Sequence, residues 1–281
     1  MLHNILVFSQ VFVVCFSLVP TSQELGICSI IGAITAVDLY SDWVCDTDLI
    51  PVGDVCTWGG IVCDGTDIIV IDLEDINISL SGTIPPEIGL LVSLKNFSVP
   101  EHYLSDVLPT EIVTLSNLEN LNLFYNDISG TIPTAVGGLI SLKYLNLNQN
   151  KNDGDIPTEM GLMVSLTTLD IAQTKLVGSI PSEMASLTNL RFLQLQQLSL
   201  TAPIPLELCQ ITGLDTMDIT GNSLVCAYDC LTATNMVGFG GLPVCEYDPT
   251  GQPTGQPTSP TSQPTGQPTS QPTSQPTTTP K

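Results

Sequence analysis

Acidic pairs such as Asp170 and Asp218 are the residues of this sequence whose spacing could suit general acid and base chemistry on a glycosidic bond. They occupy equivalent places two repeats apart in the pattern described below. Neighbouring strands of a parallel sheet lie about 4.8 Å apart, so the two carboxylates are expected roughly 10 Å from each other. That separation is at the far edge of what glycosidases use, and no cleft is predicted between them.

A nucleophile paired with a base is harder still to find. His102 is the one histidine after the N-terminal segment, and the cysteines there form an even set suited to disulfides. The same facts argue against zinc, because an oxidising environment disfavours thiolate metal sites. The sequence therefore predicts no enzyme activity, no cofactor and no metal.

Cysteines are the next residues with chemistry to explain. Cys15 lies in the apolar N-terminal run, and the other eight form two groups of four: Cys28, Cys45, Cys56 and Cys63, then Cys209, Cys226, Cys230 and Cys245. We expect disulfides between Cys56 and Cys63 and between Cys28 and Cys45. The four C-terminal cysteines allow three connectivities, and the sequence does not choose among them.

The N-terminus and the net charge restrict where the chain works and what it binds. Residues 1–22 contain an apolar run followed by small residues, which predicts a cleaved signal peptide and a secreted protein in the extracellular space or cell wall. No later apolar stretch is long enough to predict a membrane span. The formal charge of −22 argues against nucleic acid and polyanionic sugars as partners.

A regular repeat organises the middle of the chain. Leucines recur at 94, 118, 142, 166, 190 and 214, and one unit reads "LENLNLFYNDISGTIPTAVGGLIS". Counting each of these leucines as repeat position 0, apolar residues follow at positions 3 and 5, on one side of a short strand. Stacked units would share one core and one parallel sheet. The glycines and the proline are then turn residues, and no Gly-Lys-Ser/Thr follows that would indicate a phosphate loop.

Repeat position 8 is where the chain leaves the strand. Asn126, Asn150 and Asn222 stand there, and each amide is expected to bond backbone groups of neighbouring turns. Other units carry His102, Thr174 and Leu198 instead. Because leucine cannot form such bonds, local irregularity is expected over residues 197–203.

The remaining segments complete the domain organisation. We predict an N-terminal cysteine cap over 23–67, about seven repeats over 68–225, a C-terminal cysteine cap over 226–247, and a tail over 248–281. The tail repeats Pro, Thr, Ser and Gln without apolar side chains, so it is expected to be a disordered, extended stalk. Its composition favours O-glycosylation, with a plain flexible tail as the alternative.

The units are similar to the plant-type extracellular leucine-rich repeat, LxxLxLxxNxLxGxIPxxLxxLxx, over residues 68–225. The stretch "CTWGGIVC", residues 56–63, resembles the N-terminal cap signature of that family. The resemblance implies an α/β solenoid: a right-handed superhelix with a parallel sheet on its concave face and a disulfide cap at each end. It also implies a receptor-like ectodomain or a polygalacturonase-inhibitor-like protein, and recognition rather than catalysis.

Side chains that project from the predicted concave face are the candidate ligand-binding residues. Amides lie beside aromatic rings there, a combination that suits sugar faces or peptide backbone. The candidates are Asn120, Asn122, Phe124, Tyr125, Tyr144, Asn146, Asn148, Thr168, Asp170, Phe192, Gln194 and Gln196. The alternative is that these side chains only give the sheet a polar, hydrated surface and bind no ligand. Two N-glycosylation acceptors are predicted, Asn77 and Asn96.

Two functions fit these features. The first is a secreted recognition module that binds an extracellular protein, peptide or neutral glycan through the concave face. The second is a structural matrix or cell-wall protein anchored by the Pro/Thr-rich stalk. The oligomeric state is not predicted.

Overall fold

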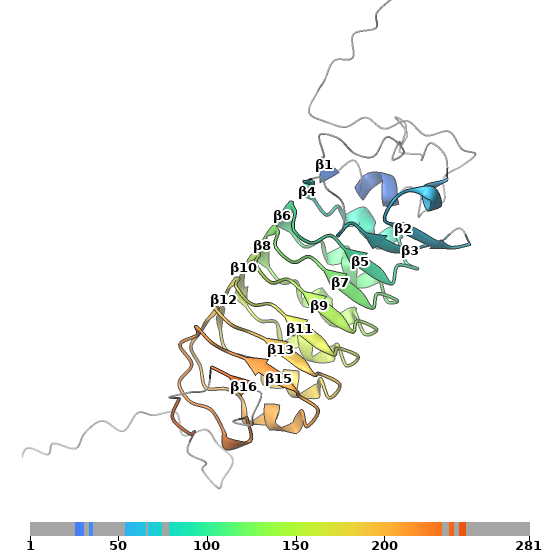
Figure 1. Ribbon diagram of the computed structural model, residues 1–281. Coiled ribbons are helices and arrows are strands. Elements are labelled where there is room, and N and C mark those ends of the chain that lie inside the picture. The colour runs from blue at the N-terminus through green and yellow to red at the C-terminus, as the bar shows by residue number, and fades with distance from the viewer. Residues whose placement is uncertain are drawn as a thin grey trace, which may run out of the picture. The chain divides into compact units, whose positions relative to one another are not determined.

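The computed structural model describes residues 26–30, 34–35, 54–65, 67–74, 79–231, 236–238 and 242–245. Within these ranges the chain is an α/β solenoid in which each repeat forms one coil (Figure 1). The predicted signal peptide, Cys45, Asn77 and the tail lie outside the described residues. Residues 26–30 form a short helix at the N-terminal end.

A nine-stranded sheet runs along one side of the solenoid, and its outward face is the predicted concave face. Its order is β16-β15-β13-β11-β9-β7-β5-β3-β2. The pairs are parallel except β2 with β3, which is antiparallel. The strands are β2 (Ile61–Asp64), β3 (Asp67–Asp72), β5 (Asn96–Ser98), β7 (Asn120–Asn122), β9 (Tyr144–Asn146), β11 (Thr168–Asp170), β13 (Phe192–Gln194), β15 (Thr216–Asp218) and β16 (Met236–Val237).

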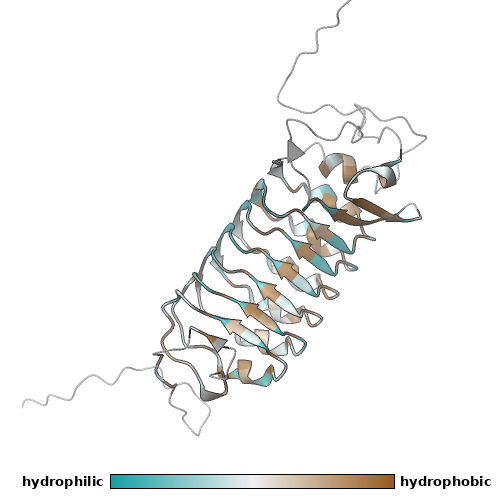
Figure 2. Cartoon of the chain, viewed as in Figure 1, coloured by the Kyte–Doolittle hydropathy of each residue, from teal (hydrophilic) through white to brown (hydrophobic). Residues whose placement is uncertain are grey.

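The register of this sheet follows the repeat. Asn96 pairs with Asn120, its equivalent in the next unit, and the same step of one full repeat recurs through β15. Val70 pairs with Asn96 across a slightly longer step, because the first unit contains two extra residues. Figure 2 shows β2 and β3 as predominantly hydrophobic, whereas the later strands mix hydrophilic and hydrophobic residues.

A seven-stranded sheet, which the sequence did not predict, follows each turn out of the first sheet. Its order is β1-β4-β6-β8-β10-β12-β14, parallel except for β1 with β4. Ser105 pairs with Asp127, so the register advances by slightly less than one full repeat per coil. The strands are β1 (Ile34–Thr35), β4 (Ser81–Thr83), β6 (Tyr103–Val107), β8 (Asp127–Thr131), β10 (Lys151–Asp155), β12 (Lys175–Gly178) and β14 (Ser199–Leu200).

Short 3-10 helices form the third side of each coil. Each of η2–η7 begins directly after a proline, such as Pro133 with φ −66° and ψ 140°, whose fixed φ suits the extended backbone of the residue before the helix. Close packing between coils requires glycine at Gly161, where a Cβ would overlap the Glu183 carbonyl oxygen. The helices are η1 (Val55–Thr57), η2 (Pro86–Leu90), η3 (Thr110–Thr114), η4 (Thr134–Gly138), η5 (Thr158–Leu162), η6 (Ser182–Ser186), η7 (Leu206–Gln210) and η8 (Asp229–Leu231).

The core is one continuous column of apolar side chains between the three sides. The leucines at positions 0, 3 and 5 are buried, as Leu118, Leu121 and Leu123 show, except Leu214 in the last repeat, which is partly buried. Each such burial stabilises the fold by about 1.5–3 kcal/mol. The column begins in the N-terminal cap, with Ile27, Ile30, Val55 and Trp58, so the cap shields what would otherwise be an open end.

The asparagines at position 8 tie their coils to the coils before them, as predicted. The Asn126 Nδ2 group donates to the Val99 carbonyl at 2.8 Å, and its Oδ1 accepts from the Leu104 amide at 2.9 Å. Asn150 and Asn222 form the equivalent bonds. In the unit with Leu198, strand β14 has two residues instead of the five of β8 and β10.

Disulfides close both ends of the solenoid. The Cys56–Cys63 bridge is confirmed. At the C-terminal end the structure selects one of the three possible connectivities, Cys209–Cys230 with Cys226–Cys245. Cys28 is also disulfide-bonded, and its predicted partner Cys45 is outside the described residues.

Candidate functional site

The outward side of the nine-stranded sheet holds the predicted ligand-binding residues. Position 2 places Asn96, Asn120, Tyr144, Thr168 and Phe192 in one row across five strands. The Asn120 Nδ2 group donates to Asn96 Oδ1 at 2.7 Å, which fixes both amides at the N-terminal end of this row. The predicted glycosylation acceptor Asn96 therefore lies on this face.

Position 4 has a structural role that the sequence did not reveal. Asn122, Asn146, Asp170 and Asp218 each accept a hydrogen bond from the backbone N–H two residues later. Such side-chain-to-backbone bonds make a tight turn at the end of each strand. One oxygen of each of these side chains is thus committed to the fold. The signal in the sequence was the recurrence of Asn and Asp at one repeat position.

A chain of hydrogen bonds crosses the middle of this face. The Asn146 Nδ2 group donates to the Tyr144 hydroxyl at 3.0 Å, and Asn148 Nδ2 donates to Asp170 Oδ2 at 3.0 Å. Asn146 and Asn148 are only 8% and 9% exposed. Burial raises the pKa of Asp170 above its ordinary value, despite hydrogen bonds from Asn148 and the Ala172 amide that lower it. The centre of the face is therefore rigid, polar and largely desolvated.

Aromatic side chains flank this polar centre. Phe192 is 44% exposed, and Phe124 and Tyr144 are half-buried. The Phe124 ring packs against Tyr125, with centroids 6.0 Å apart. Thr168 lies between Tyr144 and Phe192 in its row, and Thr168, Gln194 and Gln196 are all half-buried. The structure therefore brings the predicted candidates together on one continuous face.

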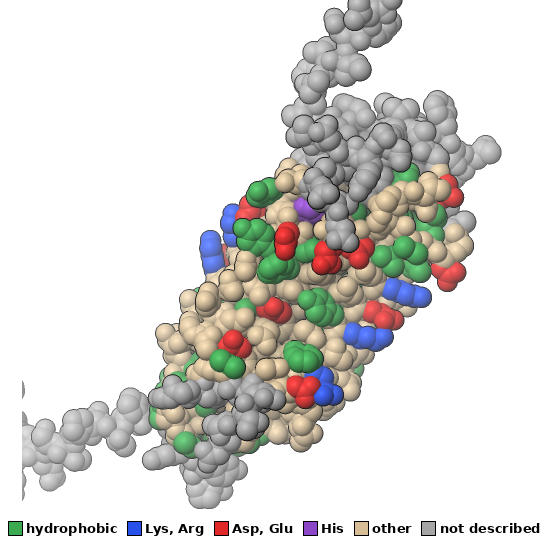
Figure 3. Space-filling model, viewed as in Figure 1, with side chains coloured by type: hydrophobic (Ala, Val, Ile, Leu, Met, Phe, Trp, Pro, Cys, Tyr) green, Lys and Arg blue, Asp and Glu red, His purple; other side chains and the backbone are tan. Residues whose placement is uncertain are grey.

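Basic side chains lie along the edges of this face. Figure 3 shows Lys and Arg side chains at its two long edges, with Asp, Glu and hydrophobic side chains between them. Three ion pairs join neighbouring coils: Lys143 with Glu119 at 2.6 Å, Lys151 with Asp127 at 2.6 Å, and Arg191 with Asp215 at 2.5 Å. All six side chains are exposed to solvent, so each pair stabilises the fold by no more than about 1 kcal/mol.

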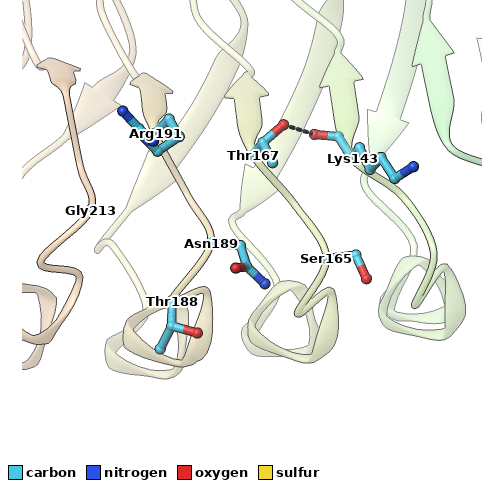
Figure 4. A pocket seen from close by; sticks show the side chains of 7 residues that line it. All are labelled: Lys143, Ser165, Thr167, Thr188, Asn189, Arg191 and Gly213. Carbon is cyan, nitrogen blue, oxygen red and sulfur yellow. Dashed lines mark hydrogen bonds between the residues drawn. The ribbon is translucent and has the colours of Figure 1, made fainter.

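One hollow of about 520 Å³ lies at the edge where the strands begin (Figure 4). Lys143, Thr167 and Arg191 are among its lining residues. The hydrogen bond and the charge of Lys143 lower the pKa of Glu119, and Arg191 is bound to Asp215. Thr167 donates its hydroxyl hydrogen to the Lys143 carbonyl. The charged groups of this hollow and the Thr167 hydroxyl are thus already paired with protein groups.

A second hollow, of about 350 Å³, lies where each coil turns from the nine-stranded into the seven-stranded sheet. Tyr103 and Tyr125 line it, and each is more than half exposed. Sequence reasoning missed Tyr103, because the candidate residues were taken only from positions that project from the predicted concave face. The recurrence of polar or aromatic residues at position 9 was the available signal.

Comparison with known proteins supports the repeat family. The model of the Leucine Rich Repeat family matches residues 117–139 and 141–163. A comparison with curated proteins finds no significant match. No helix within the described ranges is both long and apolar enough to cross a membrane.

Solved structures with similar folds come from plants. The ectodomain of the receptor kinase GASSHO1/SCHENGEN3 from Arabidopsis thaliana, in complex with CASPARIAN STRIP INTEGRITY FACTOR 2, has 30% identity and a TM-score of 0.66 over 72% of this chain and 24% of that chain. The Arabidopsis HAESA ectodomain, in complex with an IDA peptide hormone, has 25% identity and a TM-score of 0.58 over 72% of this chain and 37% of that chain.

A plant ice-binding protein shares the fold alone, with 23% identity and a TM-score of 0.62 over 73% of this chain and 72% of that chain. The present chain spans well under half of either receptor structure. The period, the Cys56–Cys63 cap, the parallel sheet and these similarities lead to one conclusion. The chain is a leucine-rich repeat protein of the plant extracellular type.

Proposed function

We propose that this chain is an extracellular recognition module that binds a protein or peptide through the outward face of its nine-stranded sheet. The observation that supports the proposal is the arrangement at the middle of that face. Half-exposed rings of Phe124, Tyr144 and Phe192 surround a hydrogen-bonded polar centre that holds Asn148 and Asp170. Aromatic side chains contribute much of the binding energy of protein interfaces, and polar groups that are already held in place lower the entropy cost of binding.

Similar structures add support of a general kind. The GASSHO1/SCHENGEN3 ectodomain is in complex with CASPARIAN STRIP INTEGRITY FACTOR 2, and the HAESA ectodomain is in complex with a peptide hormone, so this type of solenoid is suited to binding. The disulfides at both ends fit an oxidising, extracellular environment. The described residues supply binding groups, and we propose no enzymatic step.

The test is a saturable binding experiment with secreted proteins and peptides as candidate ligands. The bait is residues 24–281, compared with a triple variant in which Phe124, Tyr144 and Phe192 become Ala. We expect the triple variant to lose binding. The matched control replaces three exposed apolar residues away from this face, Ile140, Leu162 and Val164, with Ala, and we expect it to bind like the parent.

A third bait, without residues 248–281, tests the structural alternative. If the triple variant still binds the ligands but the chain without residues 248–281 does not, the recognition proposal is wrong and the chain is a matrix protein anchored by its stalk. If the chain without the tail still binds the ligands and the triple variant does not, the proposal stands.

A further inference from the structure

We infer that the 350 Å³ hollow between the two sheets, which we call the rim groove, is a binding site for a neutral β-linked glucan. Six side chains define its walls: Tyr103, Tyr125, Asp127, Gln149, Lys151 and Gln173. The rim groove is distinct from the face invoked in the proposed function, because only Tyr125 belongs to both.

The two tyrosines form the apolar part of the rim groove. Ser105 pairs with Asp127 across β6 and β8, and the same register continued two residues back places Tyr103 beside Tyr125. Tyr103 is 58% exposed and Tyr125 is 55% exposed. Phe124 packs against the Tyr125 ring and restricts it. Exposed rings with limited freedom give contact area at a low cost in side-chain entropy.

The polar part comes from the next two coils. By the registers of β8–β10 and β10–β12, Asp127 lies beside Gln149 and Lys151 lies beside Gln173. Asp127 and Lys151 form an ion pair at 2.6 Å. The structure gives the side-chain amides of Gln149 and Gln173 no hydrogen-bond partner among the residues it describes. These two amides supply four donor hydrogens and two acceptor oxygens to a ligand.

The floor of the rim groove is fixed and offers no further donor. The buried side chains of His102, Asn126 and Asn150 form it, and their polar atoms bond to backbone groups of neighbouring coils. The backbone is occupied as well. The amides of Tyr125, Gln149 and Gln173 all donate to carbonyl oxygens of the next coil. The backbone N–H groups of these three residues are therefore not available to a ligand, and side chains must supply the hydrogen-bond donors.

This distribution favours a sugar over an extended peptide. Added peptide strands take much of their affinity from main-chain hydrogen bonds to a free sheet edge, and the rim groove has no free edge. Pyranose rings need flat apolar surfaces for their C–H faces and paired donors and acceptors for their hydroxyls. Glucose in β linkage presents the flattest apolar faces, because its ring substituents are equatorial.

The net charge of the chain and the spacing of its coils restrict the class of sugar further. The chain carries a net charge of −22, which repels anionic sugars such as uronates. Neighbouring coils lie about 4.8 Å apart, which is close to the length of one pyranose unit. The row of tyrosines and the row of amides can therefore contact successive sugars of one chain.

The experiment is isothermal titration of the folded chain with cellohexaose and with laminarihexaose. We expect saturable binding of at least one. Replacing Tyr125 or Tyr103 with Ala should weaken it by about tenfold or more, since each loses a stacked ring. Tyr125→Phe keeps the ring and should stay close to the parent. Because both tyrosines are largely exposed, the variants should fold, which circular dichroism checks.

Two controls separate this proposal from the proposed function. Phe192 lies on the outward face of the nine-stranded sheet and not in the rim groove, so Phe192→Ala should leave glucan binding unchanged. Hexagalacturonate should not bind. The inference is overturned if neither glucan binds, if the double Tyr103→Ala, Tyr125→Ala variant binds like the parent, or if the rim groove binds a peptide in place of a glucan.

Discussion

The Nε2 atom of His102 lies 3.2 Å from the carbonyl oxygen of Leu73, one coil earlier in the solenoid. On the other side of the ring, Nδ1 accepts a hydrogen bond from the Leu80 amide. The imidazole thus does what the side-chain amide of Asn126 does in the next coil. Both bonds require the neutral ring with its hydrogen on Nε2.

This geometry predicts a stability that depends on pH. Burial lowers the pKa of His102 below 6.5, and this effect exceeds the raising effects of the Leu73 bond and of Glu101. As pH falls from about 6.5, the unfolded chain takes up a proton before the folded chain does, so the free energy of unfolding decreases. Denaturant unfolding at pH 7.5 and at pH 5 measures the decrease.

His102→Asn is the matched control for that prediction. An amide at this position forms the same bonds without titrating, so the variant should lose less stability between the two pH values than the parent. Equal losses in the two proteins would show that folding does not change the pKa of His102, and that burial therefore does not lower it.

Asp170→Asn should stabilise the protein at neutral pH. Burial raises the pKa of Asp170, so the folded state disfavours the charged carboxylate more than the unfolded state does. That penalty is present at pH 7 and disappears as pH falls below the ordinary value of 3.8. Asn148 has a buried Oδ1 without a partner and can turn to accept from the new amide. Thermal unfolding at pH 7 and pH 3 should show a gain only at the higher pH.

Asn152→Leu should raise the free energy of unfolding by about 1–3 kcal/mol. Asn152 is 1% exposed at position 10, where the neighbouring coils place the apolar residues Ile128 and Leu176. Its Oδ1 has no partner, and its Nδ2 reaches only the Gly130 carbonyl at 3.5 Å. Chemical denaturation measures the gain. Asn152→Asp buries a charge and should instead lower the free energy of unfolding. If Asn152→Leu leaves the free energy of unfolding unchanged, the Asn152 amide forms better hydrogen bonds than this geometry shows.

Gln197→Gly should stabilise the fold by about 1 kcal/mol. Position 7 holds a left-handed backbone in every coil from Glu101 to Gly221, and Gln197 has φ 56°. Gly221 already occupies the equivalent place in the following coil. A lower melting temperature in the variant would show that contacts of the Gln197 side chain stabilise the fold by more than its left-handed backbone destabilises it.

The sequence was sufficient to predict the parts of the fold that follow from the regular spacing of the repeats. The spacing of Leu118 and Leu142 predicted the register that pairs Asn120 with Tyr144, and the cap motif predicted the Cys56–Cys63 bridge. The bonds of Asn126 also followed, because a buried turn must satisfy its backbone groups. These features repeat, so each unit reinforces the same interpretation.

Features set by neighbouring coils could not be predicted in this way. Strand β10 reads Lys-Asn-Asp-Gly-Asp, without one apolar residue, and pairs because β8 and β12 lie on either side. The rim groove was missed for a related reason, since Tyr103 and Tyr125 occupy different repeat positions and meet only through the shorter register step of the second sheet. The binding face stays a proposal because it depends on a partner.

Uneven stiffness is a consequence of the residues that replace asparagine at position 8. Asn126, Asn150 and Asn222 clamp their coils to the preceding ones, whereas Thr174 bonds only within its own coil and Leu198 supplies no polar atom. The joints formed by the coils over residues 166–213 therefore hold fewer side-chain clamps. Under tension or torsion the stack should bend there first, and amide hydrogen exchange should be fastest at those joints. This C-terminal part of the solenoid would then act as a hinge between the stiffer coils on either side of it.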